Sequence, residues 1–133
     1  MSFTGWETNF DAAKQQAAKE HKLILLNFSG SDWCGPCIRL RKEIFESTAF
    51  KQVADSALVL VNADFPRAKK NQLTKELQQA NDTLAEKYNE KGAFPFTLLL
   101  DADGKVLRSW DGYPKEGMDE FIAEVALLTH ATH

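Results

Sequence analysis

The sequence predicts an α/β fold, a three-layer α/β/α sandwich with a central mixed sheet of about four to five strands. Two apolar runs of strand length, 23–28 and 58–64, are separated by a helical segment, as in a βαβ unit with parallel strands and a right-handed crossover. Two later strand-like runs, 93–100 and 105–110, are joined by Asp101-Ala102-Asp103-Gly104, a turn sequence that favours a β-hairpin. Helical segments before, between and after these strands supply the two outer layers.

Length and composition predict one domain over 1–133. A chain of 133 residues is long enough to bury a core without disulfide staples. Its hydrophobic share of 44%, its charged share of 26% and its net charge of −3 are those of a globular protein, and they give no reason to expect nucleic acid or an anionic membrane as partner. The sequence has no run of about 18 apolar residues and no signal-like start, so we expect no membrane insertion.

The first two elements are a helix over 9–20 and a strand over 23–28. Asn9 can cap the helix, and the segment is rich in alanine. His21 and Lys22 would end it with positive charge that complements the helix dipole, so His21 is interpreted as a solvated capping residue and not a catalyst. The near-continuous apolar run that follows is typical of a central strand covered on both faces.

A second helix is expected from Cys34 to about Glu46. Its apolar residues would face the core: Ile38, Leu40, Ile44 and Phe45. Its charged residues are expected mostly outside: Arg39, Arg41, Lys42 and Glu43. We interpret them as a solvated helix face, the alternative being that the cations tune the cysteines or steer an acidic substrate. Ser47 or Thr48 can cap a short further helix through Val53.

The segment from Phe65 to about Thr83 is expected to be an insertion between the βαβ half and the ββα half, because Phe65-Pro66 interrupts the regular pattern. Four large side chains are spaced by four, seven and four positions, which places them on one core-facing helical side: Leu73, Leu77, Leu84 and Tyr88. Asn81-Asp82 could divide this helix, with Asp82 capping the second part. From Gly117 a last helix would bury an apolar face: Met118, Phe121, Ile122, Val125 and Leu128.

Both cysteines lie in one stretch, Ser31-Asp32-Trp33-Cys34-Gly35-Pro36-Cys37. Because they are three residues apart, their sulfurs at a helix start can approach each other as thiols or close a tight disulfide. A thiolate is favoured where free N–H groups and the positive end of a helix dipole point at it, so we expect the pKa of Cys34 to lie below the usual value of about 8.5. Pro36 suits the first helical turn, and Gly35 lets a partner chain come close.

Two other interpretations of the cysteine pair remain open, a structural disulfide and half of a zinc site. A zinc site would need two further nitrogen or sulfur ligands. The sequence offers only His21, His130 and His133 as additional nitrogen ligands.

The pentapeptide from Trp33 to Cys37, Trp-Cys-Gly-Pro-Cys, resembles the active-site motif of the thioredoxin family letter for letter. The resemblance implies a thioredoxin-like fold and a redox-active Cys34–Cys37 pair, without cofactor or metal. Phe94-Pro95 is similar to the family's cis-proline dipeptide, where the backbone of Phe94 would hydrogen-bond an extended substrate and Trp33 would form part of the rim. The alternatives are a trans proline that starts a strand and a half-buried packing tryptophan.

The chain departs from the family pattern at several positions. Asn27 replaces a buried aspartate that helps proton transfer at the resolving cysteine, and Leu60 takes the place of the lysine that commonly faces that aspartate. There is one extra residue between strand and motif. The segments 30–34 and 64–66 are similar to those of exported bacterial thioredoxin-fold oxidoreductases of the disulfide-interchange type. This favours a periplasmic or otherwise exported location, with a leader removed before Phe3, and a cytoplasmic location is the alternative.

The resemblance implies a thiol–disulfide oxidoreductase in which Cys34 attacks a substrate disulfide and Cys37 resolves the mixed disulfide. The Gly-Pro pair is similar to that of thioredoxin, near about −270 mV, and unlike that of oxidants near about −120 mV, a gap of about 7 kcal/mol. We therefore predict a reductase. A disulfide isomerase or oxidase and a non-catalytic peptide-binding module are the alternatives. We expect the protein to be a monomer. Its expected partners are protein or peptide disulfides and an upstream electron donor.

Overall fold

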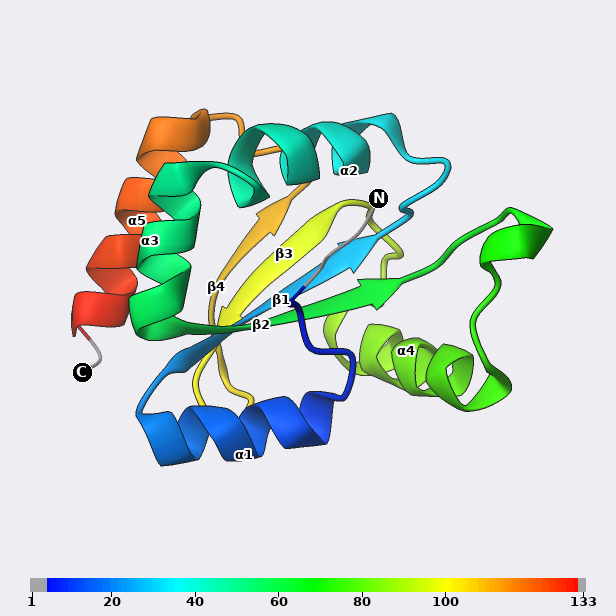
Figure 1. The fold of residues 1–133 in the computed structure, drawn as a ribbon, viewed down its shortest axis with the longest axis horizontal. Helices are drawn as coiled ribbons and strands as arrows, with labels where there is room; N and C mark the ends of the chain where they lie inside the picture. Colours follow the sequence, from blue (N-terminus) through cyan, green and yellow to red (C-terminus); the bar gives the residue numbers. More distant parts are fainter. Residues whose placement is uncertain (1–4, 132–133) are drawn as a thin grey trace.

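The computed structural model describes residues 5–131, which form a four-stranded sheet between two layers of helices (Figure 1). The elements follow one another as α1 (Phe10–Glu20), β1 (Leu23–Ser29), α2 (Gly35–Leu40), a π-helical turn (Arg41–Phe45), α3 (Thr48–Ala57), β2 (Leu58–Asp64), a 3-10 turn (Lys69–Asn71), α4 (Lys75–Tyr88), β3 (Phe96–Leu100), β4 (Val106–Asp111) and α5 (Met118–Ala131). Helices α1 and α4 cover one face of the sheet, and α2, α3 and α5 cover the other. The predicted α/β/α sandwich is confirmed.

The sheet has the strand order β2-β1-β3-β4. Strands β1 and β2 are parallel, with Leu23 opposite Leu58 and Ser29 opposite Asp64, whereas β3 is antiparallel to β1 and to β4. Every residue of β1 is buried, as expected for a central strand. The carboxyl ends of β1 and β2 therefore meet at one edge of the sheet, where the chain leaves β1 for the cysteine motif.

Strand side chains alternate between two cores, one on each face of the sheet. Leu25 and Leu99 pack with Phe50 and Phe121 under α3 and α5, while Ile24 and Leu26 pack on the opposite face. Residues from α1 and α4 close this second core: Ala13, Ala17, Leu84 and Tyr88. Each fully buried large apolar side chain contributes about 1.5–3 kcal/mol, so the two cores together hold the site's supporting strand in place.

The helix ends predicted at Asn9, His21 and Ser47 are confirmed. The side-chain oxygen of Asn9 accepts a hydrogen bond from the Ala12 N–H at 3.0 Å, and Ser47 Oγ accepts one from the Phe50 N–H at 3.1 Å. His21 ends α1 in the left-handed conformation, with φ at 58°, and its N–H donates to the carbonyl of Ala17. His21 is thus an exposed capping residue, as its sequence position indicates.

Arg41 differs from its predicted position in solvent. It is only 5% exposed, and its Nη1 donates to Glu46 Oε2 at 2.6 Å. Arg41 lies four residues after Cys37 and three before Ile44, so it shares their buried helix face despite its charge. The predicted exposure of Arg41 is wrong, because its pairing with Glu46 allows the guanidinium to be buried.

Helix α4 begins later than the leucine spacing predicts and is not divided. Thr74 Oγ1 accepts a hydrogen bond from the Leu77 N–H at 3.2 Å, so Leu73 lies before the helix. Asn81 is buried inside α4, where its Nδ2 donates to the Asp64 carbonyl at 3.0 Å, and Asp82 continues the helix without capping it. The regular four-residue spacing of Leu73 and Leu77 was therefore coincidental.

Candidate active site

Cys34 and Cys37 form a disulfide at the start of α2, with their Cα atoms 5.2 Å apart. Cys34 is the N-cap residue, and its Sγ accepts a hydrogen bond from the Cys37 N–H at 3.3 Å. Cys37 Sγ accepts one from the Gly30 N–H at 3.5 Å. Both sulfurs therefore face backbone donors, an arrangement that stabilises a thiolate after reduction.

Gly35 and Pro36 form the exposed first turn of α2 between the two cysteines. A Cβ atom at Gly35 would meet no other atom within 4 Å, so the surface beside the disulfide is open there. Pro36 sits where its missing N–H leaves no helical hydrogen bond unmade. An incoming chain can thus approach this turn without displacing a side chain at position 35.

Phe94 and Pro95 lie at the start of β3, and the peptide bond between them is cis. Pro95 is buried, and its carbonyl accepts a hydrogen bond from the Gly112 N–H at 2.8 Å. The side chain of Asn89 holds the preceding loop, because it donates to the Ala93 carbonyl at 2.9 Å and accepts from the Ala93 N–H at 3.0 Å. Sequence reasoning missed Asn89, whose only signal was its position directly after α4 and three residues before Gly92.

Trp33 is held in one orientation beside this dipeptide. Its indole N–H donates to the Phe65 carbonyl at 2.7 Å, and its ring lies edge-on to Phe94 with 5.5 Å between ring centroids. The guanidinium of Arg67 covers the ring at 3.7 Å from its centroid, and a Cβ atom on Gly30 would lie 2.3 Å from Trp33 Cε2. The structure therefore brings Trp33, Phe94 and the cysteine pair together, and it makes Trp33 a half-buried packing residue at the edge of the site.

Two carboxylates fasten the segment after β2 to the motif. Asp64 accepts hydrogen bonds from the N–H of Ser31 at 3.0 Å and from its Oγ at 2.6 Å. Asp32 accepts from the N–H groups of Arg67 and Ala68 and from the side-chain amide of Asn71, each at 2.9 Å. These donors, the Arg67 N–H first among them, lower the pKa of the Asp32 carboxyl. Residues 65–71, hereafter the 65–71 loop, are thus attached to the cysteine motif and lie beside it. The sequence predicts this segment only as an insertion.

Asn27 belongs to a buried cluster of uncharged side chains. Its Nδ2 donates to Asn62 Oδ1 at 3.1 Å, and its Oδ1 accepts from Thr97 Oγ1 at 3.0 Å. The strand register places Asn62 directly opposite Asn27 and Leu60 opposite Leu25, two positions earlier on the same face of β2. Sequence reasoning missed Asn62 as the hydrogen-bond partner of Asn27, because that pairing depends on the strand register.

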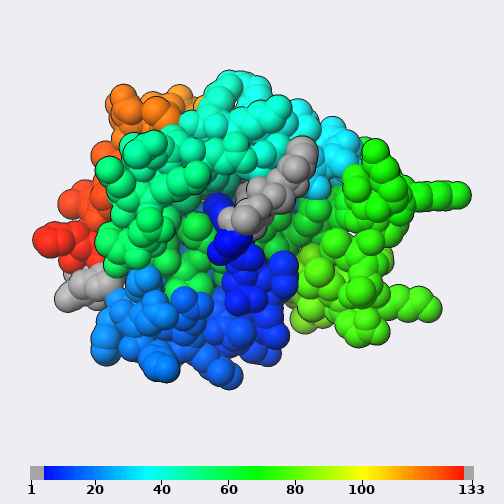
Figure 2. Space-filling model, in the orientation of Figure 1, coloured from blue at the N-terminus to red at the C-terminus, as the bar shows by residue number. Residues whose placement is uncertain are grey.

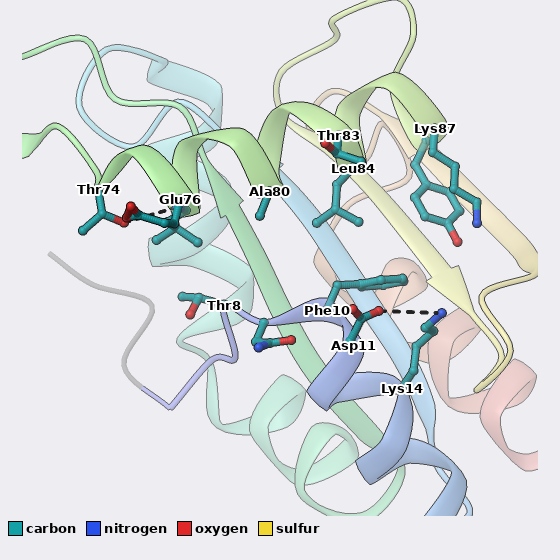
Figure 3. Close-up of a pocket in the computed structure, with 13 residues that line it drawn as sticks. Thr8, Phe10, Asp11, Lys14, Thr74, Glu76, Ala80, Thr83, Leu84 and Lys87 are labelled. Carbon is teal, nitrogen blue, oxygen red and sulfur yellow. Dashed lines mark hydrogen bonds and ion pairs between the residues drawn. The ribbon is translucent and has the colours of Figure 1, made fainter.

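A separate hollow of about 660 Å³ lies between the start of α1 and α4 (Figure 3). Phe10 and Leu84 line it, and Lys14 and Lys87 stand at its rim. No residue of the cysteine motif or of the cis dipeptide lines this hollow. The candidate site is therefore the surface around the disulfide and not this hollow.

The remaining sequence interpretations concern metals and membranes. Within residues 5–131, no group of three or more His, Cys, Asp or Glu side chains is placed to hold a metal ion. His130 lies in α5, and His133 lies outside the described residues. None of the helices in the described part of the chain has both the length and the apolar character needed to cross a bilayer.

Comparisons with known proteins place this geometry in context. A family model described as Thioredoxin-like matches residues 5–102. The disulfide bond reductase DsbH of Chlamydia pneumoniae is 36% identical over 120 residues, which cover 90% of this chain and 69% of that protein. The thioredoxin-related protein DsbJ of the same organism is 31% identical over 71% of this chain, which spans only 26% of the length of DsbJ. A solved structure of a DsbH oxidoreductase has a TM-score of 0.81 at 35% identity and covers 92% of this chain and 83% of its own.

Proposed function

The chain belongs to the thioredoxin-like family of thiol–disulfide oxidoreductases, and from this premise we propose that it reduces protein disulfides through Cys34 and Cys37. The observation that carries the proposal is the Cys34–Cys37 disulfide at the start of α2. A cysteine pair that forms this disulfide when oxidised can donate two electrons when it is reduced to two thiols. The name of the similar DsbH, a disulfide bond reductase, supports the same direction of electron flow.

The proposed cycle begins with the reduced pair. The Cys34 thiolate attacks one sulfur of the substrate disulfide, whose S–S bond breaks as a Cys34–substrate bond forms, and the leaving substrate thiolate takes a proton from water. Cys37 then gives its proton to water and attacks Cys34 Sγ, which closes the Cys34–Cys37 bond and expels the second substrate thiolate. Two electrons have passed to the substrate, and a dithiol donor must return them before the next cycle.

We assign different roles to the two sulfurs from their positions and hydrogen bonds at the start of α2. Cys34 is the attacking sulfur, because it caps the helix beside the open turn at Gly35 and receives the Cys37 N–H. Cys37 is the resolving sulfur, since it lies one turn inside the helix, behind the Gly35-Pro36 turn. Within the described residues, the peptide groups of Phe94 make no hydrogen bond, so they are available to pair with an extended substrate.

The direction of electron flow rests on the residues between the cysteines. With Gly35-Pro36 in place, we expect a reduction potential near about −270 mV, and we take a value above about −150 mV as the mark of an oxidase or isomerase. Equilibration of the protein with glutathione redox buffers measures this potential. A non-catalytic module, by contrast, would hold a disulfide that dithiothreitol cannot open reversibly.

An exported location is part of the proposal. Both DsbH and DsbJ are bacterial Dsb proteins, which supports it. The substrates would then be protein or peptide disulfides of that compartment, where disulfides persist, and the electron donor would be a dithiol protein of the same compartment.

Two variants test the roles of the cysteines. Cys37→Ser should accumulate a covalent mixed disulfide between Cys34 and a substrate such as insulin, visible by intact mass, because nothing resolves it. Cys34→Ser should form no adduct and reduce nothing. Equal adduct formation by both variants would refute the assignment of the attacking sulfur.

Titration of the reduced protein tests the chemistry of Cys34 itself. Thiolate absorbance in the ultraviolet should give a pKa for this thiol below about 8.5 and towards 7. The Cys34→Ser variant serves as the control that removes the signal. A thiol that stays protonated up to about pH 9 would leave the proposed cycle without its nucleophile.

A further inference from the structure

The 65–71 loop carries three positive side chains, none of which forms an ion pair in the described part of the chain: Arg67, Lys69 and Lys70. With Lys75 they are the charged residues between Asp64 and Glu76, in a chain whose net charge is −3. All four are exposed.

The arginines of the cysteine-bearing helix differ from these loop cations. Arg39 pairs with Glu43 at 3.4 Å, and Arg41 is buried against Glu46 at 2.6 Å. Their charge is therefore largely compensated within the protein. Lys42, farther along in the π-helical turn, is exposed and forms no ion pair in the described part of the chain, and the loop adds three more such cations beside the motif.

Arg67 is the loop cation that reaches the motif. Its guanidinium lies 3.7 Å from the centroid of the Trp33 ring, and Trp33 directly precedes Cys34. Its backbone is fixed because its N–H donates to Asp32 at 2.9 Å. A guanidinium stacked on an aromatic face keeps its N–H edge free to bind a carboxylate, and its partial ordering lowers the entropic cost of binding.

We propose that Arg67, with Lys69 and Lys70 beside it, selects substrate disulfides that are flanked by acidic residues. The substrate carboxylates would contact the guanidinium while Cys34 attacks the adjacent disulfide. Figure 2 shows the loop, in green, beside the blue-to-cyan residues of the motif at one edge of the molecule. Asp32 and Asp64 form no ion pair with these cations in the described part of the chain, and their carboxylate oxygens accept instead from the N–H and O–H donors described above. The inference rests on the proposed reductase function and adds its substrate class.

The test uses two synthetic peptides that share one disulfide and differ only in whether glutamate or lysine residues flank it. Single-turnover rate constants are measured with the pre-reduced protein at low salt. We expect the acidic peptide to react about five-fold faster, since each exposed charge pair contributes a small factor and three cations act together. The preference should shrink at about 0.5 M salt because of screening.

Charge reversal at Arg67 is the deciding variant. Arg67→Glu should lower the acidic-to-basic rate ratio by at least about two-fold towards one, with the remaining preference due to Lys69 and Lys70, whereas Lys51→Glu, the same charge change at an exposed position on α3, should preserve the wild-type ratio. The ratio is informative because both peptides meet the same thiolate, so a change in the reactivity of Cys34 cancels.

Three outcomes separate the inference from the function on which it rests. A wild-type ratio of one, or a ratio that Arg67→Glu leaves unchanged, overturns the role of Arg67 while the protein remains a reductase. Failure to reduce either peptide overturns the reductase function and the inference together. A lowered ratio in Arg67→Glu with an unchanged ratio in Lys51→Glu supports the inference.

Discussion

Two polar clusters flank the cysteine motif, and they are built from opposite chemistry. Inside the sheet, Asn27, Asn62 and Thr97 are buried and uncharged, and they hydrogen-bond one another. Near the surface, Asp32 and Asp64 are partly exposed carboxylates that accept hydrogen bonds from the chain beside the motif. The difference follows the cost of burying charge, which is high inside a sheet and low where water still reaches the group.

The two clusters therefore serve the site in different ways. The inner cluster joins β1, β2 and β3 without a group that titrates, so it offers no proton to the resolving cysteine. The outer cluster fixes the 65–71 loop, and through that loop it sets the positions of Trp33 and Arg67. Substitutions that exchange the chemistry of the clusters, or remove one of their contacts, test this division.

The largest effect is expected from Asn27→Asp, which places a carboxyl at a position only 1% exposed. Burial should raise the pKa of the new acid in the folded state by about two units, which lowers the free energy of unfolding at pH 7 by about 3 kcal/mol. Because the folded-state pKa lies above the unfolded value near 3.9, this charge-dependent loss is absent below about pH 4 and grows as pH rises towards the folded-state pKa. Urea unfolding of the variant and the wild type at pH 4 and at pH 7 measures this loss of unfolding free energy.

The same variant tests the mechanism. If a buried acid assists Cys37, Asn27→Asp should reduce insulin faster than the wild type does, and an unchanged rate would show that water or another group moves the proton. Asn71→Asp, the same substitution beside Asp32 of the outer cluster, removes one donor and adds a like charge, but it should cost less stability because water screens the repulsion at this exposed position. An equal loss at pH 4 and pH 7 for Asn27→Asp would mean that shape, and not charge, causes it.

A smaller effect is expected from Thr97→Val. The substitution keeps the shape of the side chain but removes the hydroxyl that donates to Asn27 Oδ1. A buried amide oxygen without a partner should lower the free energy of unfolding by about 2 kcal/mol. Thr97→Ser, which keeps the hydroxyl, should lose less in the same urea titration, and equal losses would show that the hydrogen bond contributes little.

The sequence predicts most reliably those features that depend on near neighbours. The apolar run 58–64 became β2 with the same bounds, and Asn9 and Ser47 cap their helices through bonds that span three residues. The position of the cysteine pair at a helix start is equally local, since Gly35-Pro36 begins that helix. These features need no knowledge of distant parts of the chain.

The features that sequence reasoning missed depend on contacts across the fold. Asp32 holds Arg67, 35 positions later, and Asn27 meets Asn62 across the same separation. Asn81 was read as a helix breaker, but it is buried because the Asp64 carbonyl needs a donor at the end of β2. Such pairings become visible only once the register of the parallel strands is known.

Gly30→Ala should perturb the outer cluster through Trp33. The new methyl group would lie 2.3 Å from the indole ring, so the ring must move and lose its hydrogen bond to the Phe65 carbonyl. We expect a loss of about 1 kcal/mol in unfolding free energy, with a changed near-ultraviolet circular dichroism spectrum. Gly35→Ala is the matched control, because its methyl group meets no atom within 4 Å. A Gly30→Ala spectrum identical to that of the wild type would contradict the packing described for Trp33.

The smallest and most local effect is expected from Asp32→Ala. Removal of the carboxylate frees the N–H groups of Arg67 and Ala68, so their amide NMR signals should move and the amide protons should exchange faster with solvent, while the cores stay intact.

The pH dependence of the wild type tests the same contacts, because the pKa of Asp32 is lowered chiefly by the Arg67 N–H, below the ordinary value of 3.8. The stabilising contacts are therefore complete above that ordinary value and are lost as pH falls through the lowered pKa. The amide shifts of Arg67 and Ala68 in the wild type should titrate with a midpoint below pH 3.8. In the control variant Asp82→Ala, which removes an exposed acid on α4, the amide shifts of the same two residues should follow the wild-type curve. A midpoint at or above 3.8 would mean that Asp32 does not hold the loop, and the outer cluster would then rest on Asp64 alone.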